Sequence, residues 1–168
     1  YHDVSDGGLF ATLAEMAFAG HCGLDVNLPG KEGSAVEQLF AEEPGVVLQV
    51  RAAALDALQV TWRLHGLEHC VREIGAPAVD MRVRIAVGEA ALDISWRELR
   101  EAWSRTSCEM RRLRDEPTCA DEEFAASCDE TDPGLGVALN FDSDNDVAAP
   151  YIARGARPRV AVLREQGV

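Results

Sequence analysis

The strongest constraint on the fold is a change in the spacing of apolar residues within the first 28 positions. Apolar side chains recur at helical spacing from Leu9 to Phe18, which predicts a helix that ends at Gly20. Residues 22–28 then alternate apolar and polar side chains in period two, which indicates a half-buried strand. The first 28 residues therefore contain a predicted helix that is followed directly by a strand.

The next part of the chain predicts two helices and one strand. Ser34 and Glu37 form the capping-box pattern of a short helix that continues through Phe40. The run Val46–Val50 is apolar enough for a central strand of a sheet. Residues 53–65 carry an apolar stripe at helical spacing before Gly66 and predict an amphipathic helix.

A hairpin and a long helix complete the predicted domain. Residues 70–74 indicate a strand, and residues 81–87 and 91–94 alternate around a glycine turn and predict a hairpin. The pair Ser95 and Glu98 caps a helix over residues 96–114. On that helix the spacing directs Leu99, Trp103, Met110 and either Thr106 or Ser107 inward.

Strands that first alternate with helices and then pair in a hairpin predict an α+β fold, with a layered mixed β-sheet and helices packed against it. This predicted domain spans residues 1–116. From Pro117 the composition becomes acidic and rich in glycine and proline without a sustained period, so residues 117–158 are predicted to form an irregular linker. A buried-type strand is predicted at Val160–Leu163.

The polar stretch before the first helix contains the main candidate functional residues. Gly7 and Gly8 allow positive φ and a close approach of the backbone to a ligand, and a helix N-terminus attracts anions such as phosphate. Asp3 and Asp6 would repel a phosphate unless a hard cation such as Mg²⁺ bridges them to it. These residues predict a metal-nucleotide loop. The alternative is that Ser5 or Asp6 is an ordinary N-cap and the glycines form a turn.

Composition excludes several classes of partner. The 168 residues include 29 acidic and 16 basic ones, with a net charge of −13 and a pI near 4.6, which argues against binding to nucleic acid or an anionic membrane. An apolar run of the roughly 20 residues that span a bilayer is absent. Five cysteines without a C-x-x-C pair suggest neither a disulfide framework nor a zinc site. A cytoplasmic protein is expected.

Four ordered stretches carry a resemblance that covers almost the whole chain. They are His2–Leu9 with Leu13–Gly23, Trp103–Asp115, Asp132–Leu135, and Asp146–Ile152 with Val160–Val168. Together they closely resemble the long bacterial form of the phosphoribosylformylglycinamidine synthases, which are glutamine-dependent ligases of purine biosynthesis. The resemblance implies a domain like the C-terminal domain of aminoimidazole ribonucleotide synthetase over residues 1–116, taken from the second synthetase copy. Residues 159–168 are then the first strand of a truncated class I glutamine amidotransferase domain.

The resemblance also implies an activity and its site. Such an enzyme uses ATP and glutamine to convert formylglycinamide ribonucleotide to formylglycinamidine ribonucleotide. Asp3 is then a Mg²⁺ ligand and Ser5 a nucleotide contact, with Gly7 and Gly8 in the same nucleotide-binding loop and Asp6 in a supporting role. The implied cofactors are Mg²⁺ and ATP or ADP, and the other partners are the two substrates and the remaining domains of the same polypeptide. The glutaminase cysteine lies beyond residue 168, so this piece alone is expected to have no catalytic residue and no activity.

Two alternatives stay open at this point. Val4 stands where many members of the family carry arginine, and the nucleotide site of the second synthetase copy is an auxiliary, structural one, so the chain could be a non-catalytic nucleotide-binding module. The chain could also belong to another branch of the same superfamily, such as the selenophosphate synthetases or the hydrogenase maturation factors. The sequence from Val162 to Val168 disfavours that second alternative.

Overall fold

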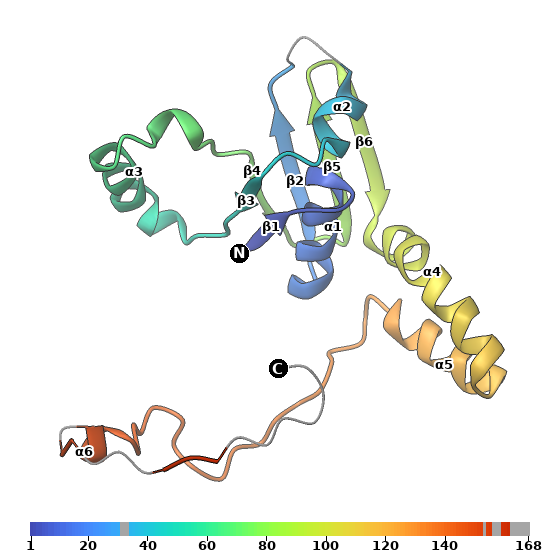
Figure 1. Cartoon of the computed structure of the whole chain (residues 1–168). Coiled ribbons are helices and arrows are strands. Elements are labelled where there is room, and N and C mark those ends of the chain that lie inside the picture. Colours follow the sequence, from blue (N-terminus) through green and yellow to red (C-terminus); the bar gives the residue numbers. More distant parts are fainter. Residues whose placement is uncertain (31–33, 153, 156–158, 162–168) are drawn as a thin grey trace. The chain divides into compact units, whose positions relative to one another are not determined.

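The computed structural model describes residues 1–30, 34–152, 154–155 and 159–161, and the chain forms two compact units. The first unit covers Tyr1–Asp132 and holds both sheets, and the second covers Pro133–Val168. Figure 1 shows the elements in chain order. Among the described residues of the second unit, the one regular element is the short helix α6, Ala149–Ile152.

The larger sheet has four strands in the order β4-β2-β5-β6. Strand β2 is parallel to β5, whereas the pairs β2 with β4 and β5 with β6 are antiparallel. The strands are β2 (Gly23–Leu28), β4 (Gly75–Ala78), β5 (Arg82–Val87) and β6 (Ala90–Ser95). The predicted strand at residues 22–28 and the predicted hairpin are confirmed, and the mixed sheet with packed helices confirms the α+β fold.

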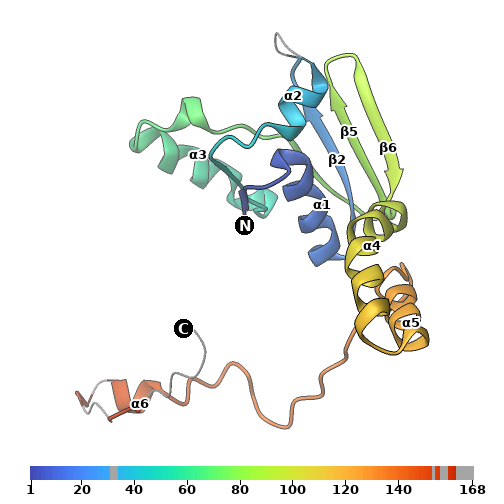
Figure 2. The same cartoon turned by 45° about the vertical axis from the view of Figure 1, so that its right-hand side comes forward.

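The core lies between one face of this sheet and helix α1, Gly8–Gly20 (Figure 2). Strict alternation in β2 and β5 sends every second side chain to this face, and Val83 and Ile85 are only 1% and 2% exposed. Leu13 and Ala17 of α1 cover them, and Trp96 donates from Nε1 to the carbonyl oxygen of Ala17 at 3.0 Å. Each fully buried aliphatic side chain contributes about 1.5–3 kcal/mol, so this layer dominates the stability of the unit.

The opposite face of the larger sheet is polar. Arg84 of β5 forms ion pairs with Asp80 and with Asp25 of the neighbouring strand β2, and Arg82 pairs with Asp93 of β6 at 2.7 Å. All of these side chains are substantially exposed, so each pair adds little stability. The face is a solvated one that carries alternating charges.

The smaller sheet consists of β1 (His2–Val4) and β3 (Gly45–Val47), which pair antiparallel with Asp3 opposite Val46. The prediction of a central strand over Val46–Val50 is wrong, because β3 has three residues, pairs with β1 and leaves Val46 58% exposed. An apolar run does not by itself specify which strand it will pair with. The connecting helix α2 (Ala35–Phe40) has the predicted capping box of Ser34 with Glu37.

Residues 48–74 form a helical excursion between the two sheets. It contains η1 (Ala52–Ala54), the predicted helix as α3 (Leu55–Leu64), and η2 (Glu68–Cys70). None of the residues of these three elements is buried. The prediction of a strand over residues 70–74 is wrong, since the strand β4 starts at Gly75. Gly75 and Pro77 are untypical of a strand, so the sequence pattern did not indicate β4. An edge strand such as β4, however, tolerates proline.

Helix α4, Trp96–Arg114, begins with the predicted capping box, in which the Ser95 hydroxyl accepts from the Glu98 amide at 3.1 Å. Its first turn buries Trp96 and Leu99 in the core. The predicted inward face is wrong beyond that point, because Trp103 and Met110 are 53% and 66% exposed. The second half of α4 leaves the sheet and packs on another helix instead.

That partner is α5, Pro117–Ser127, which occupies part of the segment predicted to be irregular. Glu116 caps it by accepting from the Cys119 amide at 2.8 Å, and Pro117 stands in its first turn. Cys108 of α4 is buried against Ala120 of α5, and ion pairs such as Arg111 with Glu123 lie at the edge of the contact. The contact between α4 and α5 involves small side chains, which explains why the sequence shows no apolar period that would have predicted α5.

Two further expectations concern the remaining residues. The predicted strand at Val160–Leu163 and its continuation to residue 168 lie largely outside the described residues. The division of the chain into a domain, a linker and the start of a further domain stays a prediction. In the part of the chain that the structure describes, no helix has the length and apolarity to cross a membrane.

Candidate functional site

The predicted metal-nucleotide loop connects β1 to α1. The amide of Gly8 donates to the carbonyl oxygen of Ser5 at 2.9 Å, and Gly7 and Gly8 have φ values of 82° and 67°. Gly7 occupies the N-cap position of α1 and makes no side-chain capping bond there. The alternative in which Ser5 or Asp6 is an ordinary N-cap is therefore wrong, while the glycines do supply the left-handed conformation of a turn.

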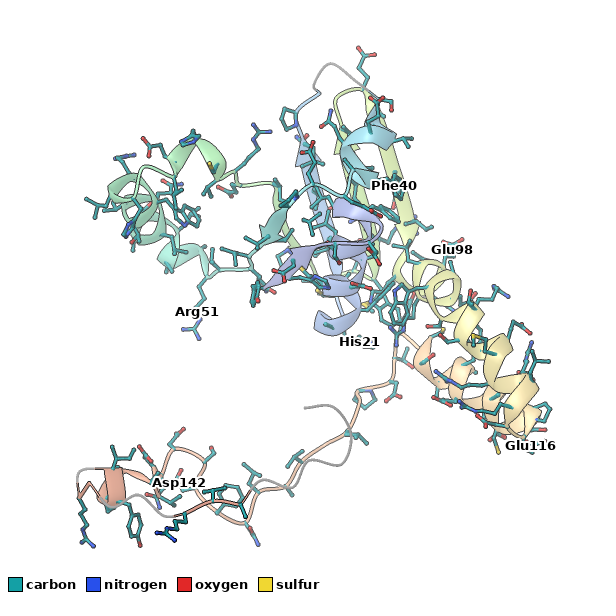
Figure 3. The ribbon with its side chains drawn as sticks, in the orientation of Figure 1. His21, Phe40, Arg51, Glu98, Glu116 and Asp142 are labelled. Carbon is teal, nitrogen blue, oxygen red and sulfur yellow. The ribbon has the colours of Figure 1, made fainter. Side chains whose placement is uncertain are left out.

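Gly8 has a second structural role, since it brings α1 against the end of α2. A Cβ on Gly8 would lie 2.8 Å from the carbonyl oxygens of Leu39 and Ala41. Figure 3 labels Phe40 in this connection, where its ring centroid lies 5.1 Å from that of Phe10 on α1. No side chain other than hydrogen fits at Gly8, so its presence is explained by packing without a ligand.

The backbone amides at the N-terminus of α1 are not all free to bind an external anion. The amide of Gly7 donates to Oε1 of Glu42 at 3.0 Å, so a carboxylate of the chain already occupies part of the site predicted for phosphate. Glu42 lies 35 positions away in the sequence, and no local pattern marked it as a residue of the loop. Its negative charge, together with Asp3 and Asp6, makes the loop acidic and favours a cation over a bare anion.

Contacts with other residues hold the main chain of Asp3 in place. Its carbonyl oxygen accepts from Oγ1 of Thr12 at 3.1 Å and lies 2.7 Å from Nδ1 of His2. Thr12 is 2% exposed, and its hydroxyl proton is shared with the carbonyl oxygen of Gly8, which also lies 3.1 Å from Oγ1, so one buried hydroxyl joins β1 to the start of α1. Pairing with Val46 fixes the other edge of Asp3. The backbone that carries the candidate ligand is therefore defined from three sides.

The carboxylate of Asp3, in contrast, is exposed and makes no hydrogen bond or ion pair with any residue that the structure describes. A free carboxylate on a fixed backbone is a suitable oxygen ligand for Mg²⁺. The described residues contain no group of three or more His, Cys, Asp or Glu side chains that could hold a metal ion. Asp3 thus fits as one ligand, with water or nucleotide oxygens among the others, and the exposed Ser5 lies on the same loop.

Side-chain contacts connect His2 of β1 to α1 and α4. Its Nε2 lies 2.8 Å from Oε2 of Glu15, and the other oxygen of Glu15 accepts from Nε1 of Trp103 at 3.2 Å. Trp103 in turn stacks under Arg100, whose Cζ lies 4.9 Å from the ring centroid. Neither Glu15 nor its link to His2 could be singled out from the sequence, because Glu15 and Trp103 alone lie 88 positions apart.

A groove of about 560 Å³ lies beside the loop, between the core and the excursion. Val4 and Leu9 form its apolar side, Glu37 and Glu43 carry negative charge, and Arg72 provides a cation. Its other lining residues are Leu28, Gln38, Ala41, Pro44, His69, Cys70, Val71 and Ile74. Val4, where the resembling family often carries arginine, therefore faces this groove as an apolar residue.

Comparison with known protein families agrees with this architecture. The sequence model of the family described as AIR synthase related protein, C-terminal domain, matches residues 1–88. The match covers more than half of the 168 residues and includes the loop, α1, both sheets up to β5, and the excursion. The chain therefore belongs to the AIR synthase related proteins and is a member of the corresponding synthetase superfamily.

Proposed function

We propose that this chain is part of a phosphoribosylformylglycinamidine synthase, the ATP- and glutamine-dependent ligase that converts formylglycinamide ribonucleotide to formylglycinamidine ribonucleotide. Its contribution is a loop that binds Mg²⁺ and ATP or ADP, with Asp3 as a metal ligand and Ser5, Gly7 and Gly8 in the nucleotide-binding loop. The other partners are the two substrates and further domains of the same polypeptide, in the cytoplasm. Family membership and the four resembling stretches support this assignment.

The observation that carries the proposal is that the main chain of Asp3 is fixed while its carboxylate is free. Thr12, His2 and Val46 fix its main chain, and its carboxylate is left exposed without a partner among the described residues. Orienting a ligand before the metal arrives reduces the entropy that binding has to overcome. Bound Mg²⁺ would neutralise charge on the nucleotide phosphates. The residues of this chain would orient the metal, and Ser5 would donate to a phosphate oxygen.

A second candidate is a nucleotide-binding module without catalytic chemistry. The contact of Glu42 with the Gly7 amide and the packing role of Gly8 favour it, because both give the loop a structural purpose. In that case the nucleotide stabilises the fold and does not react. The two candidates share Asp3 and differ in whether kcat or stability falls when Asp3 is changed.

The test is Asp3→Asn in the intact protein, with Asp56→Asn as a matched control that removes the same charge from the exposed first turn of α3. We expect Asp3→Asn to lose copurified nucleotide and the rise in melting temperature produced by Mg²⁺ with ADP. Asp56→Asn retains both. If kcat collapses in folded Asp3→Asn protein the site is catalytic, and if activity falls only with stability it is structural. Unchanged nucleotide content in Asp3→Asn would refute both candidates.

A further inference from the structure

We infer that Glu15 and Trp103 are positioning residues for the metal site, because they hold His2 in the orientation that fixes the carbonyl of Asp3. This inference rests on the proposed role of Asp3 as a metal ligand. Glu15 is the central residue, since its two carboxylate oxygens contact different elements: Oε2 contacts His2 of β1 and Oε1 accepts from Trp103 of α4.

The direction of the connection follows from the contacts of His2. With its Nε2 held at 2.8 Å by Glu15, the imidazole presents Nδ1 to the Asp3 carbonyl oxygen at 2.7 Å. The strand β1 has only three residues and one partner strand, and among the described residues the Asp3 carbonyl oxygen has one further side-chain donor, the hydroxyl of Thr12. Losing the Glu15 contact would free the ring of His2 and loosen the main chain that carries the ligand.

The connection is not needed by the hydrophobic core. His2 and Glu15 have side chains that are 32% and 35% exposed, Trp103 is 53% exposed, and none of them is a buried residue of the core. Exposed polar contacts of this kind contribute little to global stability. Hydrogen-bonding partners behind a metal ligand, however, typically change metal affinity by about 10–100-fold. The set therefore serves the geometry of Asp3 more than the stability of the fold.

A substitution series on the intact protein tests the inference, with Mn²⁺ in the presence of ADP as the probe and the signal of free Mn²⁺ in electron paramagnetic resonance as the readout. We expect Glu15→Ala to weaken Mn²⁺ binding by about tenfold. Glu15→Gln should restore it to within about twofold, because the amide oxygen still accepts from Trp103 and the amide nitrogen donates to Nε2 of a His2 with its proton on Nδ1.

Trp103→Phe is the second variant and keeps the aromatic packing while it removes one donor to Glu15. We expect it to weaken Mn²⁺ binding by about threefold, and it carries the test if Glu15→Ala does not fold. Asp3→Asn measures the background from other acidic groups on this surface. Unchanged affinity in Asp3→Asn would refute the metal site itself. Loss in Asp3→Asn but wild-type affinity in folded Glu15→Ala and in Trp103→Phe, or equal loss in Glu15→Ala and Glu15→Gln, would refute the positioning role alone.

Discussion

The two sheets of the first unit differ in how they are held together. The larger sheet buries one face of its central strands β2 and β5, where Val83 and Ile85 are 1% and 2% exposed, whereas Val46 of the smaller sheet is 58% exposed. The smaller sheet relies on hydrogen bonds to the Asp3 carbonyl from Thr12 and His2. Stability thus depends on the larger sheet, whereas the proposed ligand site lies beside the smaller one, and substitutions should separate the two properties.

The largest effect is expected from Ile85→Ala in β5. The change leaves a cavity in the fully packed layer and should lower the free energy of unfolding by about 4 kcal/mol. The matched change Val46→Ala in β3 should cost less than about 1 kcal/mol, since that side chain is already exposed. Urea unfolding of both variants measures the difference. Similar losses would contradict the contrast between the sheets.

The next effect concerns the loop that joins the smaller sheet to α1. Gly8→Ala combines a positive φ of 67° with a clash against the backbone of α2 and should cost about 3 kcal/mol. Gly66→Ala is the matched control, because Gly66 has a φ of 68° and a Cβ added there would meet nothing within 4 Å. It should cost about 1 kcal/mol. Equal losses in urea unfolding would show that backbone strain, and not the contact with α2, accounts for Gly8.

The features that could be predicted from the sequence are those that depend on neighbouring residues. Helix α1, strand β2, the hairpin and the capping boxes of Ser34 and Ser95 were predicted, because period and capping act over a few neighbouring residues. The run Val46–Val50 was predicted to be a central strand, whereas β3 pairs only with β1 in the smaller sheet, because the choice of partner strand depends on distant contacts.

Helices and contacts without an apolar pattern were missed for a related reason. Helix α5 packs through small side chains such as Ala120, so no period predicted it. At the site, Asp3 and the glycines were proposed from local chemistry, whereas Glu42 and Glu15 enter through contacts that join distant parts of the chain. The metal and nucleotide roles of Asp3, Ser5, Gly7 and Gly8 stay predictions.

A smaller loss of stability is expected when either capping serine is removed. Ser34→Ala and Ser95→Ala each remove one hydroxyl that accepts a backbone N–H, and each should cost about 1 kcal/mol in urea unfolding. Only Ser34→Ala should also weaken the binding of Mg²⁺ with ADP, because α2 leads into the segment that contacts Gly8. Weaker binding in Ser95→Ala would show that the loop depends on the larger sheet as well.

The smallest effect is expected on the polar face of the larger sheet. Hydrogen bonds from Arg84 lower the pKa of Asp80 below its ordinary value of 3.8. A carboxyl whose pKa is lower in the folded state stabilises the fold above its unfolded pKa, and this contribution disappears as the pH falls through the folded pKa. Wild type should exceed Asp80→Asn slightly in melting temperature at pH 7, and the two should converge below pH 3.8. A difference that persists in strong acid would exclude this pair as its source.

The proposed function depends most on Asp3 as a metal ligand. Anomalous diffraction from crystals of the intact protein grown with Mn²⁺ and ADP tests this directly, because it locates the ion independently of activity. We expect an anomalous peak about 2.1 Å from a carboxylate oxygen of Asp3 and adjacent to the nucleotide phosphates. A nucleotide-bound Mn²⁺ that lies away from Asp3, with the Asp3 carboxylate still free, would contradict the account.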